Sequence, residues 1–435
     1  MKKLLPLFIG VALGTVAPLA SADDLIQVYE QAKQSDPQLL QAAATKDAAF
    51  AAVDTNRGTL LPQINLNAGY NLSRNSNDSI TDSNLLTAGV DVSQELFSQN
   101  SWINLDIAEI TARQADATYA AEQQSLILRV STAYFDVLRA IDDLVFVRAE
   151  KAAVGRQLEQ TKQRFEVGLS AITDVHDAQA QYDSVLAQEI QAKNVVTNSY
   201  EELREITGQS HAELSVLNTR TFSASSPEQT QDALVKQAEE TNLSLLAQRI
   251  TRDASKERIS LAESGHMPSL TLNAGYDYTD RTHSQNDLSN NELSGGINFN
   301  MPLYTGGSTT AQVKEAQFNY VAASEALEAR YRSTVKDVRA FYNNINASIG
   351  SLRAFEQTVV SARSALEATE AGFEVGTRTI VDVLDSTRRL YDANRSLSDA
   401  RYDYILSVLQ LRQAVGTLNE DDLVEINQGL VPPKK

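Results

Sequence analysis

Two aspartates stand three residues apart where the last long helix of the chain is predicted to begin. This spacing places the carboxylates of Asp382 and Asp385 on one face of that helix. Two unit charges about 6 Å apart repel by roughly 1 kcal/mol in water. One interpretation is that the pair complements the positive end of the helix dipole. Another is that symmetry repeats it as a ring of carboxylates around an axial opening, which would favour cations and bind multivalent ones.

A second polar group, at Asp174, His176 and Asp177, has the residue types of a metal site. Asp174 and Asp177 share a helix face while His176 points elsewhere, so we interpret the three as capping and solvated surface residues. The chain has no cysteine and only four scattered histidines, which disfavours a metalloenzyme. No nucleophile, base and orienting group occur together in the sequence. We therefore expect no enzymatic activity, no catalytic residue, no cofactor and no metal.

The charge and the first residues of the chain narrow the class of protein. With 38 Lys and Arg against 56 Asp and Glu, the formal net charge is −18. We expect no nucleic acid partner, because phosphate binding needs a basic face. Residues 1–22 combine Lys2 and Lys3, an apolar stretch and small residues before Asp23, which predicts a signal peptide cleaved after Ala22. No later segment offers about 18 consecutive apolar residues, so any membrane crossing must use strands.

Two parts of the chain, about 207 residues apart, have the same sequence features in the same order. Residues 62–70 recur as 268–276, and Gly208 recurs as Gly416. Such a repeat predicts that the mature chain consists of two copies of one unit. The first unit covers residues 23–229, the second 230–416, and residues 417–435 form a C-terminal segment and a short tail.

Each unit is predicted to contain helices, one β-hairpin and two further long helices. Apolar and polar residues alternate with period two on both sides of a polar loop, which is typical of a hairpin. The segments that follow lack proline and almost lack glycine, so we expect helices of up to roughly 100 Å at about 1.5 Å per residue. The hairpins lie at about 62–98 and 268–304, and the long helices at about 102–167, 174–207, 309–375 and 382–415.

Two local patterns describe these helices further. Asp36 and Pro37 have the N-cap and first-position proline of a helix start, and Pro62 ends that helix. Within the first long helix, apolar residues advance in heptad-like steps, which predicts coiled-coil packing outside the membrane. The seam consists of Ile127, Tyr134, Leu138, Ile141 and Val145.

The hairpin strands have the length of transmembrane strands. About 12 residues tilted near 45° cross somewhat under 30 Å, the thickness of a bilayer core. Packing on a soluble core is the alternative, but no predicted element covers the apolar strand faces. Four strands would leave two edges unpaired in lipid, so the chain must oligomerise to close a barrel, and the residues alone do not choose the number of copies. Aromatic residues lie at the strand ends, where they would form an interfacial girdle or pack at a junction: Phe97, Trp102 and Tyr304.

The residues between the paired long helices predict two tight helical hairpins at the far tip of a rod. Gly168 and Gly376 suit the left-handed position that ends a helix. Thr173, Asp174 or nearby polar groups can cap the helix that follows.

The whole mature chain resembles the TolC family of outer-membrane efflux and export channels, also called outer membrane factors. The most specific segments are residues 171–175, 180–187, 341–349, 376–385 and 416–420. The resemblance implies an α+β fold, in which a trimeric 12-stranded transmembrane β-barrel (four strands per protomer) continues into a long periplasmic α-helical coiled-coil barrel. It places the protein in the outer membrane of a Gram-negative bacterium. Short segments would girdle the helices at an equator; the candidates are the N-terminal helix, residues 209–241 and the segment after Gly416.

The function implied by the resemblance is that of a passive channel-tunnel, the exit duct for tripartite multidrug efflux pumps and type I protein secretion. Its partners would be two further copies of the chain, outer-membrane lipid, a periplasmic adaptor protein and an inner-membrane efflux or ABC transporter. A non-conducting, envelope-spanning structural coiled coil is the alternative, although it would need neither alternating hairpins nor a ring of acids. The loops near residues 75–84 and 283–290 contain no sequence motif that identifies a phage or bacteriocin receptor.

By the same resemblance, Asp382 and Asp385 match the cation-selective ring at the periplasmic entrance. Phe373 stands where the best-known members have a tyrosine that bonds to the residue matched by Asp174, and loss of that hydroxyl removes typically about 1 kcal/mol. We therefore expect the closed state to depend more on Arg378. The other residues that match closed-state contacts are Thr173, Asp174, Gln157 and Glu370, and the helical tips expected to engage the adaptor are Gly168, Leu169, Gly376 and Thr377.

Overall fold

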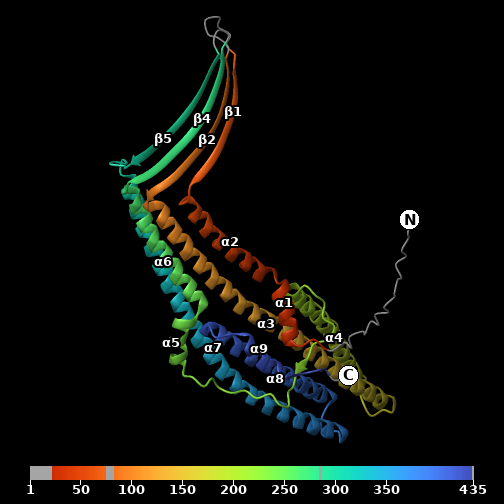
Figure 1. Ribbon diagram of the computed structural model, residues 1–435. Helices are drawn as coiled ribbons and strands as arrows, with labels where there is room; N and C mark the ends of the chain where they lie inside the picture. The colour runs from red at the N-terminus through yellow and green to blue at the C-terminus, as the bar shows by residue number, and fades with distance from the viewer. Residues whose placement is uncertain (1–21, 75–82, 284–286, 434–435) are drawn as a thin grey trace, which may run out of the picture.

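A computed structural model of the chain describes residues 22–74, 83–283 and 287–433. A sheet lies at one end and long helices extend away from it (Figure 1). Both units have the same order of two helices, two long strands and two long helices, in agreement with the predicted α+β class and internal duplication. The predicted signal peptide, apart from Ala22, and residues 75–82 of the first predicted loop lie outside the described residues.

The bounds of the elements show how closely the two units correspond. The first unit contains α1 (Leu25–Ser35), α2 (Pro37–Thr59), β1 (Gln63–Ser73), β2 (Ser83–Ser98), α3 (Gln99–Glu166) and α4 (Ile172–Thr207), followed by the short strand β3 (Val216–Leu217). The second contains α5 (Gln231–Thr241), α6 (Leu243–Glu263), the 3-10 turn η1 (Ser264–His266), β4 (Ser269–His283), β5 (Asp287–Asn300), α7 (Ser308–Glu374) and α8 (Ile380–Val415). The chain ends with α9 (Glu420–Asn427) and β6 (Leu430–Val431).

The second helix of each unit begins with the same kind of side-chain cap. Asp36 accepts a hydrogen bond from the backbone N–H of Leu39 at 2.8 Å, and Pro37 occupies the first turn of α2, as predicted. At the corresponding place in the second unit, Asn242 accepts from the N–H of Leu245, also at 2.8 Å. The duplication therefore extends to the chemistry of the helix starts.

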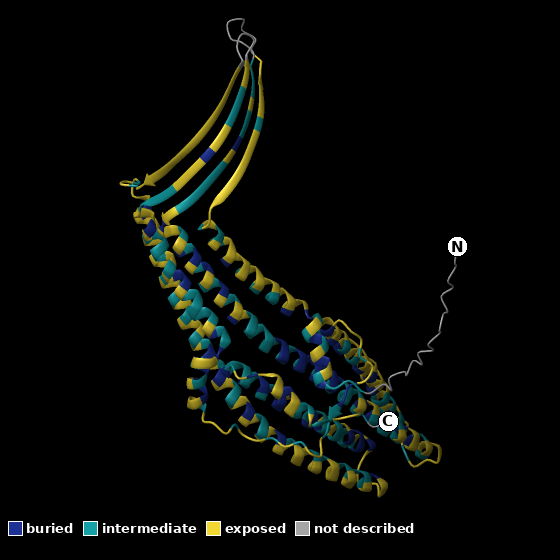
Figure 2. Cartoon of the chain, viewed as in Figure 1, coloured by how far each residue is buried: buried dark blue, intermediate teal, exposed yellow. Residues whose placement is uncertain are grey.

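The two hairpins join into one antiparallel sheet with the strand order β1-β2-β4-β5. The register aligns apolar residues across all four strands: Leu66 faces Val90, Val90 faces Tyr276, and Tyr276 faces Leu293. Leu66 is 78% exposed and Leu293 is 83% exposed, so nothing in the described chain covers this row of apolar residues. Figure 2 shows the same exposure over most of the sheet. The outer strands β1 and β5 each pair on one side only.

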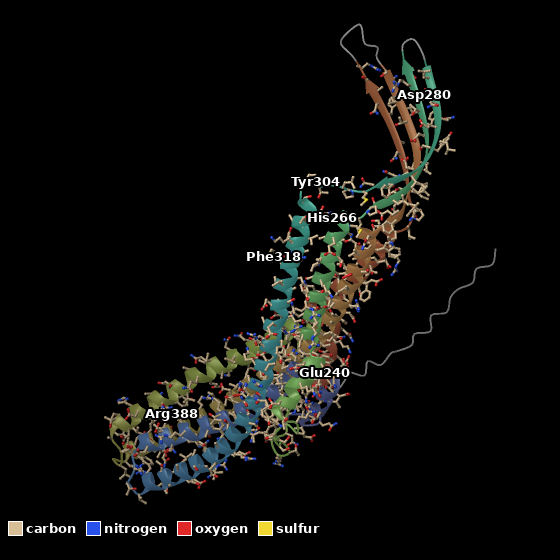
Figure 3. The ribbon with its side chains drawn as sticks, turned by 90° about the vertical axis from the view of Figure 1, so that its left-hand side faces the viewer. Glu240, His266, Asp280, Tyr304, Phe318 and Arg388 are labelled. Carbon is tan, nitrogen blue, oxygen red and sulfur yellow. The ribbon has the colours of Figure 1, made fainter. Side chains whose placement is uncertain are left out.

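Three exposed aromatic residues lie where strands give way to helices. Phe97 follows a register irregularity between β2 and β4, and Trp102 lies in the first turn of α3. Tyr304, between β5 and α7, is 88% exposed and is labelled in Figure 3. None of the three is buried against the described chain.

The helices α3 and α7 have 68 and 67 residues. Part of the predicted seam on α3 is buried, with Tyr134 and Leu138 at 1% exposure or less. The seam prediction is wrong at Val145, which is 54% exposed, whereas Val147 is buried. Towards the tip, the buried residues of α3 include Ala140, Val147, Val154 and Thr161, a seven-residue repeat that runs one position before the predicted Ile141. None of the described helices is both long and apolar enough to span a membrane.

The main core lies about midway along the helices, where the short elements gather around α3 and α8. Tyr134 is fully buried there, and its hydroxyl donates to the Ser215 carbonyl at 2.7 Å. The strands β3 and β6 pair at Val216 and Val431, and α1 contacts α9 through the Tyr29 hydroxyl and Glu420 at 3.0 Å. The segments expected at an equator therefore pack together around the long helices.

Candidate functional site

The two turns at the end remote from the sheet share one backbone conformation. Gly168 and Gly376 have φ angles of 77° and 78°, which confirms the predicted left-handed positions. In the first turn, the N–H of Leu169 donates to the carbonyl of Arg164 at 2.8 Å; in the second, that of Thr377 donates to Gly372 at 2.9 Å. This bonding pattern is the Schellman motif, which satisfies the last carbonyls of a helix. Both tips are therefore closed, regular helical hairpins.

Acidic side chains start the helix after each turn. Asp382 accepts from the backbone N–H and the hydroxyl of Thr379, both at 2.9 Å, in a complete capping box. Asp174 accepts from the Ser170 hydroxyl at 2.7 Å and from the N–H of Ala171 at 3.2 Å. Both predicted capping residues lie in the first turn of α4, and Asp174, not Thr173, accepts these bonds.

The charge of Asp382 is stabilised locally. The backbone N–H and then the hydroxyl of Thr379 hold the pKa of the Asp382 carboxyl below its ordinary value, and Arg378 contributes to the same shift. The group is accordingly ionised at neutral pH, as an acidic ring would require.

Asp385 has partners that the sequence analysis overlooked. Arg388 donates to one of its oxygens, and Arg389 donates to the other at 2.6 Å. These residues lie three and four positions after Asp385, a spacing that could have identified them. Figure 3 shows Arg388 towards the end of α8 remote from the sheet. The two arginines and the two aspartates together have no net charge, so the electrostatic field of the predicted ring is weaker than that of its carboxylates alone.

Phe373 makes a contact between the two helical hairpins. It is 9% exposed, and the guanidinium of Arg164, from the other hairpin, lies 4.7 Å from the centre of its ring. A cation over an aromatic face at this distance is attractive. The contact joins the last turns of α3 and α7, so Phe373 helps to hold the tips together without a hydroxyl group.

The remaining predicted gate residues do not meet within one protomer. Arg378 packs its side chain against Gly372, to which its N–H also donates at 3.2 Å. Among the described residues, no hydrogen bond or ion pair joins Arg378 to Thr173 or Asp174. The same holds for Gln157 and Glu370, and Gln157 Oε1 is buried without a partner.

The helical tips expose apolar surface beside the two glycines. Val167 and Leu169 are each 70% exposed in the first turn, and Val375 is 76% exposed in the second. Thr377 is also exposed. Each tip therefore offers a small apolar patch on a rigid turn.

One group of side chains has the order of a catalytic relay but lacks access to a substrate. His211 lies between the carboxylate of Asp23, at 2.9 Å, and the hydroxyl of Thr207, at 3.1 Å. Thr207 is fully buried, and its hydroxyl lies 3.0 Å from the Leu203 carbonyl, to which it donates. The group therefore anchors the N-terminal residues of the described chain to the end of α4. Within residues 22–74, 83–283 and 287–433, no three His, Asp or Glu side chains are placed to hold a metal ion.

Comparison with known proteins assigns this architecture to a family. The model of the outer membrane efflux protein family matches residues 28–209 and again 234–417, one match in each unit. The chain belongs to the outer membrane efflux protein family. It is 63% identical over 439 residues to the outer membrane protein TolC of Vibrio cholerae, covering 100% of both chains. It is also 28% identical over 444 residues to the alkaline protease secretion protein AprF of Pseudomonas aeruginosa, covering 97% of this chain and 90% of AprF.

Solved structures of outer membrane efflux proteins share the fold. A crystal structure of CusC superposes with a TM-score of 0.77 at 15% identity, covering 90% of this chain and 92% of CusC. As a member of the family, the chain is located in the outer membrane. The double match to the family model agrees with the internal duplication seen in the fold.

Proposed function

We propose that three copies of this chain form a channel-tunnel through which drugs and secreted proteins leave the cell. The sheet supports this proposal most directly: it has an uncovered apolar face and two single-paired edges, and it continues into helices of 68 and 67 residues. Lipid does not tolerate unpaired strand edges, so β1 of one copy pairs with β5 of the next. Three copies, the number that the family resemblance implies, give a closed barrel of 12 strands continuous with a helical tunnel in the periplasm.

The ends of the strands and the equator support an orientation in which the helices extend from the membrane into the periplasm. Phe97, Trp102 and Tyr304 are exposed where an aromatic girdle would meet the lipid headgroups. Past the equator, the helices extend to the tips at Gly168 and Gly376, which are the periplasmic end of the tunnel. The relationship to AprF, a protease secretion protein, supports type I secretion as one of the export routes.

At the tips, the six α7–α8 and α3–α4 hairpins surround the entrance. Asp382 and Asp385 form its cation-selective ring, and Arg388 and Arg389 moderate the charge of that ring. In the trimer, Arg378 contacts Thr173 and Asp174 of a neighbouring protomer, and Gln157 and Glu370 form a second constraint. Arg164 and Phe373 stabilise the closed tips within each protomer.

The exposed tips are the docking site for a periplasmic adaptor. The apolar patches at Val167, Leu169 and Val375 lie on rigid turns, which suit insertion between the tips of a partner's helices. An adaptor joined to an inner-membrane efflux or ABC transporter would bind there and open the entrance. The chain itself performs no chemistry in this process.

Conductance of the purified protein in a planar bilayer tests the proposal. We expect discrete single-channel currents that a trivalent cation blocks from the periplasmic side, and loss of the block in the variant Asp382→Asn plus Asp385→Asn. A matched control is Asp47→Asn plus Asp54→Asn, which neutralises two exposed aspartates on α2, far from the tips. The control should be blocked like the wild type. If the wild-type protein inserts but conducts no current, it is a structural spacer and not a channel. If the trivalent cation still blocks the tip variant, Asp382 and Asp385 do not form the proposed ring.

A further inference from the structure

Charged and polar groups concentrate where the two helical hairpins face each other, between the equatorial core and the tips. This polar ladder joins α3 of the first hairpin to α8 of the second. It consists of Arg139, Asp142 and Asp143 on α3 and Arg395, Ser398, Asp399, Tyr402 and Asp403 on α8.

The hydrogen bonds in the middle of the polar ladder are buried. The Tyr402 hydroxyl donates to Asp142 Oδ2 at 2.8 Å, and Ser398 donates to the same oxygen. Tyr402 is 2% exposed. Burial and then the Asp142 charge raise the pKa of Tyr402, so the hydroxyl remains a donor over the whole range of physiological pH. Asp142 therefore holds α8 at one defined register against α3.

Ion pairs at the edge of solvent lie on both sides of these hydrogen bonds along the helices. Arg139 Nη2 lies 2.7 Å from Asp403 Oδ1, and its Nε lies 3.8 Å from Asp399 Oδ1. Arg395 forms an ion pair with Asp143 across the same interface. The side chains of Arg139 and Arg395 are 33% and 32% exposed, so water screens these pairs in part.

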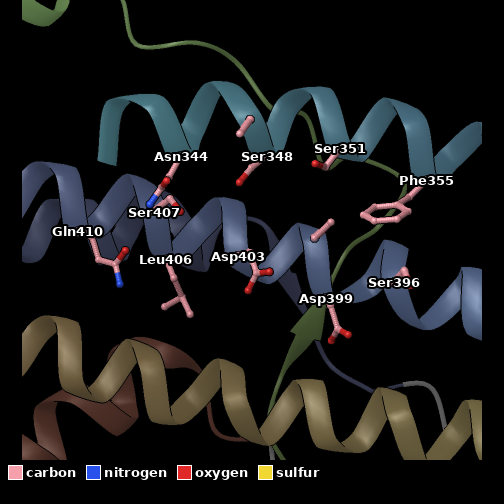
Figure 4. A pocket seen from close by; sticks show the side chains of 12 residues that line it. Asn344, Ser348, Ser351, Phe355, Ser396, Asp399, Asp403, Leu406, Ser407 and Gln410 are labelled. Atoms are coloured by element: carbon pink, nitrogen blue, oxygen red, sulfur yellow. The ribbon is translucent and has the colours of Figure 1, made fainter. Parts of the chain in front are cut away.

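Open grooves lie on both sides of α8 in the single chain. One, of about 610 Å³, lies between α3, α4 and α8 and is lined by ladder residues together with Gln188 and Gln191. The other, of about 590 Å³, lies between α7 and α8 and has mostly small and polar lining residues. Figure 4 shows this second groove, with Asp399 directed away from Ser351 of α7.

The covalent connections make this interface the one that can open. A five-residue turn joins α3 to α4 at one tip, and another joins α7 to α8 at the other. No such turn joins α3 to α8, and the chain links their hairpins covalently only through the equator and the sheet. Apolar packing tolerates small sliding, whereas hydrogen bonds and close ion pairs weaken steeply with about 1 Å of displacement. The polar ladder is therefore the part of the interface most sensitive to a relative motion of the hairpins.

We propose that the polar ladder is a latch, which fixes α8 in its closed register on α3 and must break before the entrance opens. This inference rests on the proposed channel function and assigns Arg139, Asp142, Asp143 and Arg395 as positioning residues for gating. Ion pairs of this exposure change an equilibrium by about 1.4- to 5-fold each. If three protomers open together, the effect of one pair is cubed, to about 3- to 125-fold on the open probability.

Single-channel recording of the full-length protein tests the latch. We expect Arg395→Gln and Asp143→Asn each to raise the open probability, and the charge exchange Arg395→Asp with Asp143→Arg to bring it back towards wild type. The matched control is Glu189→Gln. Glu189 pairs with Arg148, Lys151 and Lys193 inside the α3–α4 hairpin, so this variant breaks ion pairs without separating the hairpins.

The dependence of the open probability on salt concentration distinguishes a gating role of the polar ladder from a purely structural one. Raising the ionic strength from about 0.1 to 1 M shortens the Debye length from about 10 to 3 Å and weakens exposed ion pairs. The open probability of the wild type should rise with salt, and that of a variant with both Arg139→Gln and Arg395→Gln should rise less. If the wild type conducts but the ladder variants and Glu189→Gln gate alike, the latch is refuted and the channel stands. If the wild type passes no current, the channel function itself fails, and the latch with it.

Discussion

Replacing Arg129 by methionine tests how the structure fixes α2 to α3. Arg129 donates through Nη1 to Asp36 Oδ1 at 2.9 Å and through Nη2 to Oδ2 at 2.8 Å. Asp36 is 2% exposed and also caps α2 through the N–H of Leu39. Burial alone would raise the pKa of Asp36, but the Arg129 guanidinium and the backbone N–H groups outweigh it and hold the pKa below its ordinary value.

The expected cost follows from this geometry. Removing one partner of a fully buried ion pair costs about 3–5 kcal/mol, because it leaves an uncompensated charge. The Arg129 side chain is 25% exposed, and Asp36 still accepts the hydrogen bond from Leu39 when Arg129 is replaced. We therefore expect a smaller loss of stability, about 2–3 kcal/mol, for Arg129→Met. Adding Asp36→Asn should recover most of the loss, because asparagine still caps the helix without the charge.

Hydrogen exchange of the first turns of α2 measures this difference. Exchange through local opening should become about 30- to 140-fold faster in Arg129→Met, since each 1.4 kcal/mol corresponds to about tenfold. The control is Arg57→Met, which removes exposed ion pairs with Asp54 in the same helix and with Glu109 on α3 and should leave exchange within about twofold. Unchanged exchange in Arg129→Met, or a double variant no better protected than the single one, would show that Asp36 does not depend on the guanidinium.

Three further predictions concern the equator and the tips. In Gly416→Ala, the new Cβ would clash with the carbonyl that ends α5, and the φ angle of 90° would add backbone strain. Thermal unfolding should show a loss of stability of at least about 3 kcal/mol, against about 1 kcal/mol for Gly376→Ala, where the space around the glycine is open. Equal losses would contradict the predicted clash. Tyr134→Phe leaves a buried carbonyl without its donor and should cost about 1–2 kcal/mol by the same assay, whereas a neutral result would imply a replacement donor. The hydrogen bond from Lys33 holds the pKa of the Glu420 carboxyl below its ordinary value of 4.5, although burial opposes the shift. The resulting stabilisation of α9 against α1 is therefore present above pH 4.5 and is lost as the pH falls through the lowered pKa. The protection of the α9 amides against exchange should fall as the pH drops below 4.5, and Glu420→Gln should lack that change.

Local chemistry made much of the fold predictable from the sequence. Asp36 and Pro37 could be recognised as a helix start because the cap bond spans only three residues. Gly168 and Gly376 could be placed in the left-handed region because a residue without a Cβ adopts it at little cost. The hairpins followed from an alternation that is visible within a dozen residues.

Local patterns did not predict which face of a helix is buried or where a strand ends, because both depend on distant parts of the chain. Val145 continues the heptad-like spacing but is exposed, because the residues buried towards the tip include Ala140, Val147 and Val154, in a register that the neighbouring helices set. The second predicted loop is mostly strand, since β4 extends to His283 and β5 begins at Asp287. Pairing between strands, and not the polarity of the residues, sets the length of these elements.

The strands, the long helices and the turns that end them follow from the sequence alone, because each depends on residues within a few positions of one another. The duplication follows from it too, because the same pattern of residues recurs about 207 positions later. Three contacts became visible in the folded chain alone: Asp142 with Tyr402, Arg139 with Asp403, and His211 with Asp23. Partners separated by 188 to 264 residues are brought together by the packing of whole helices. Many charged residues are available for each such contact, and the side-chain types alone do not distinguish among them.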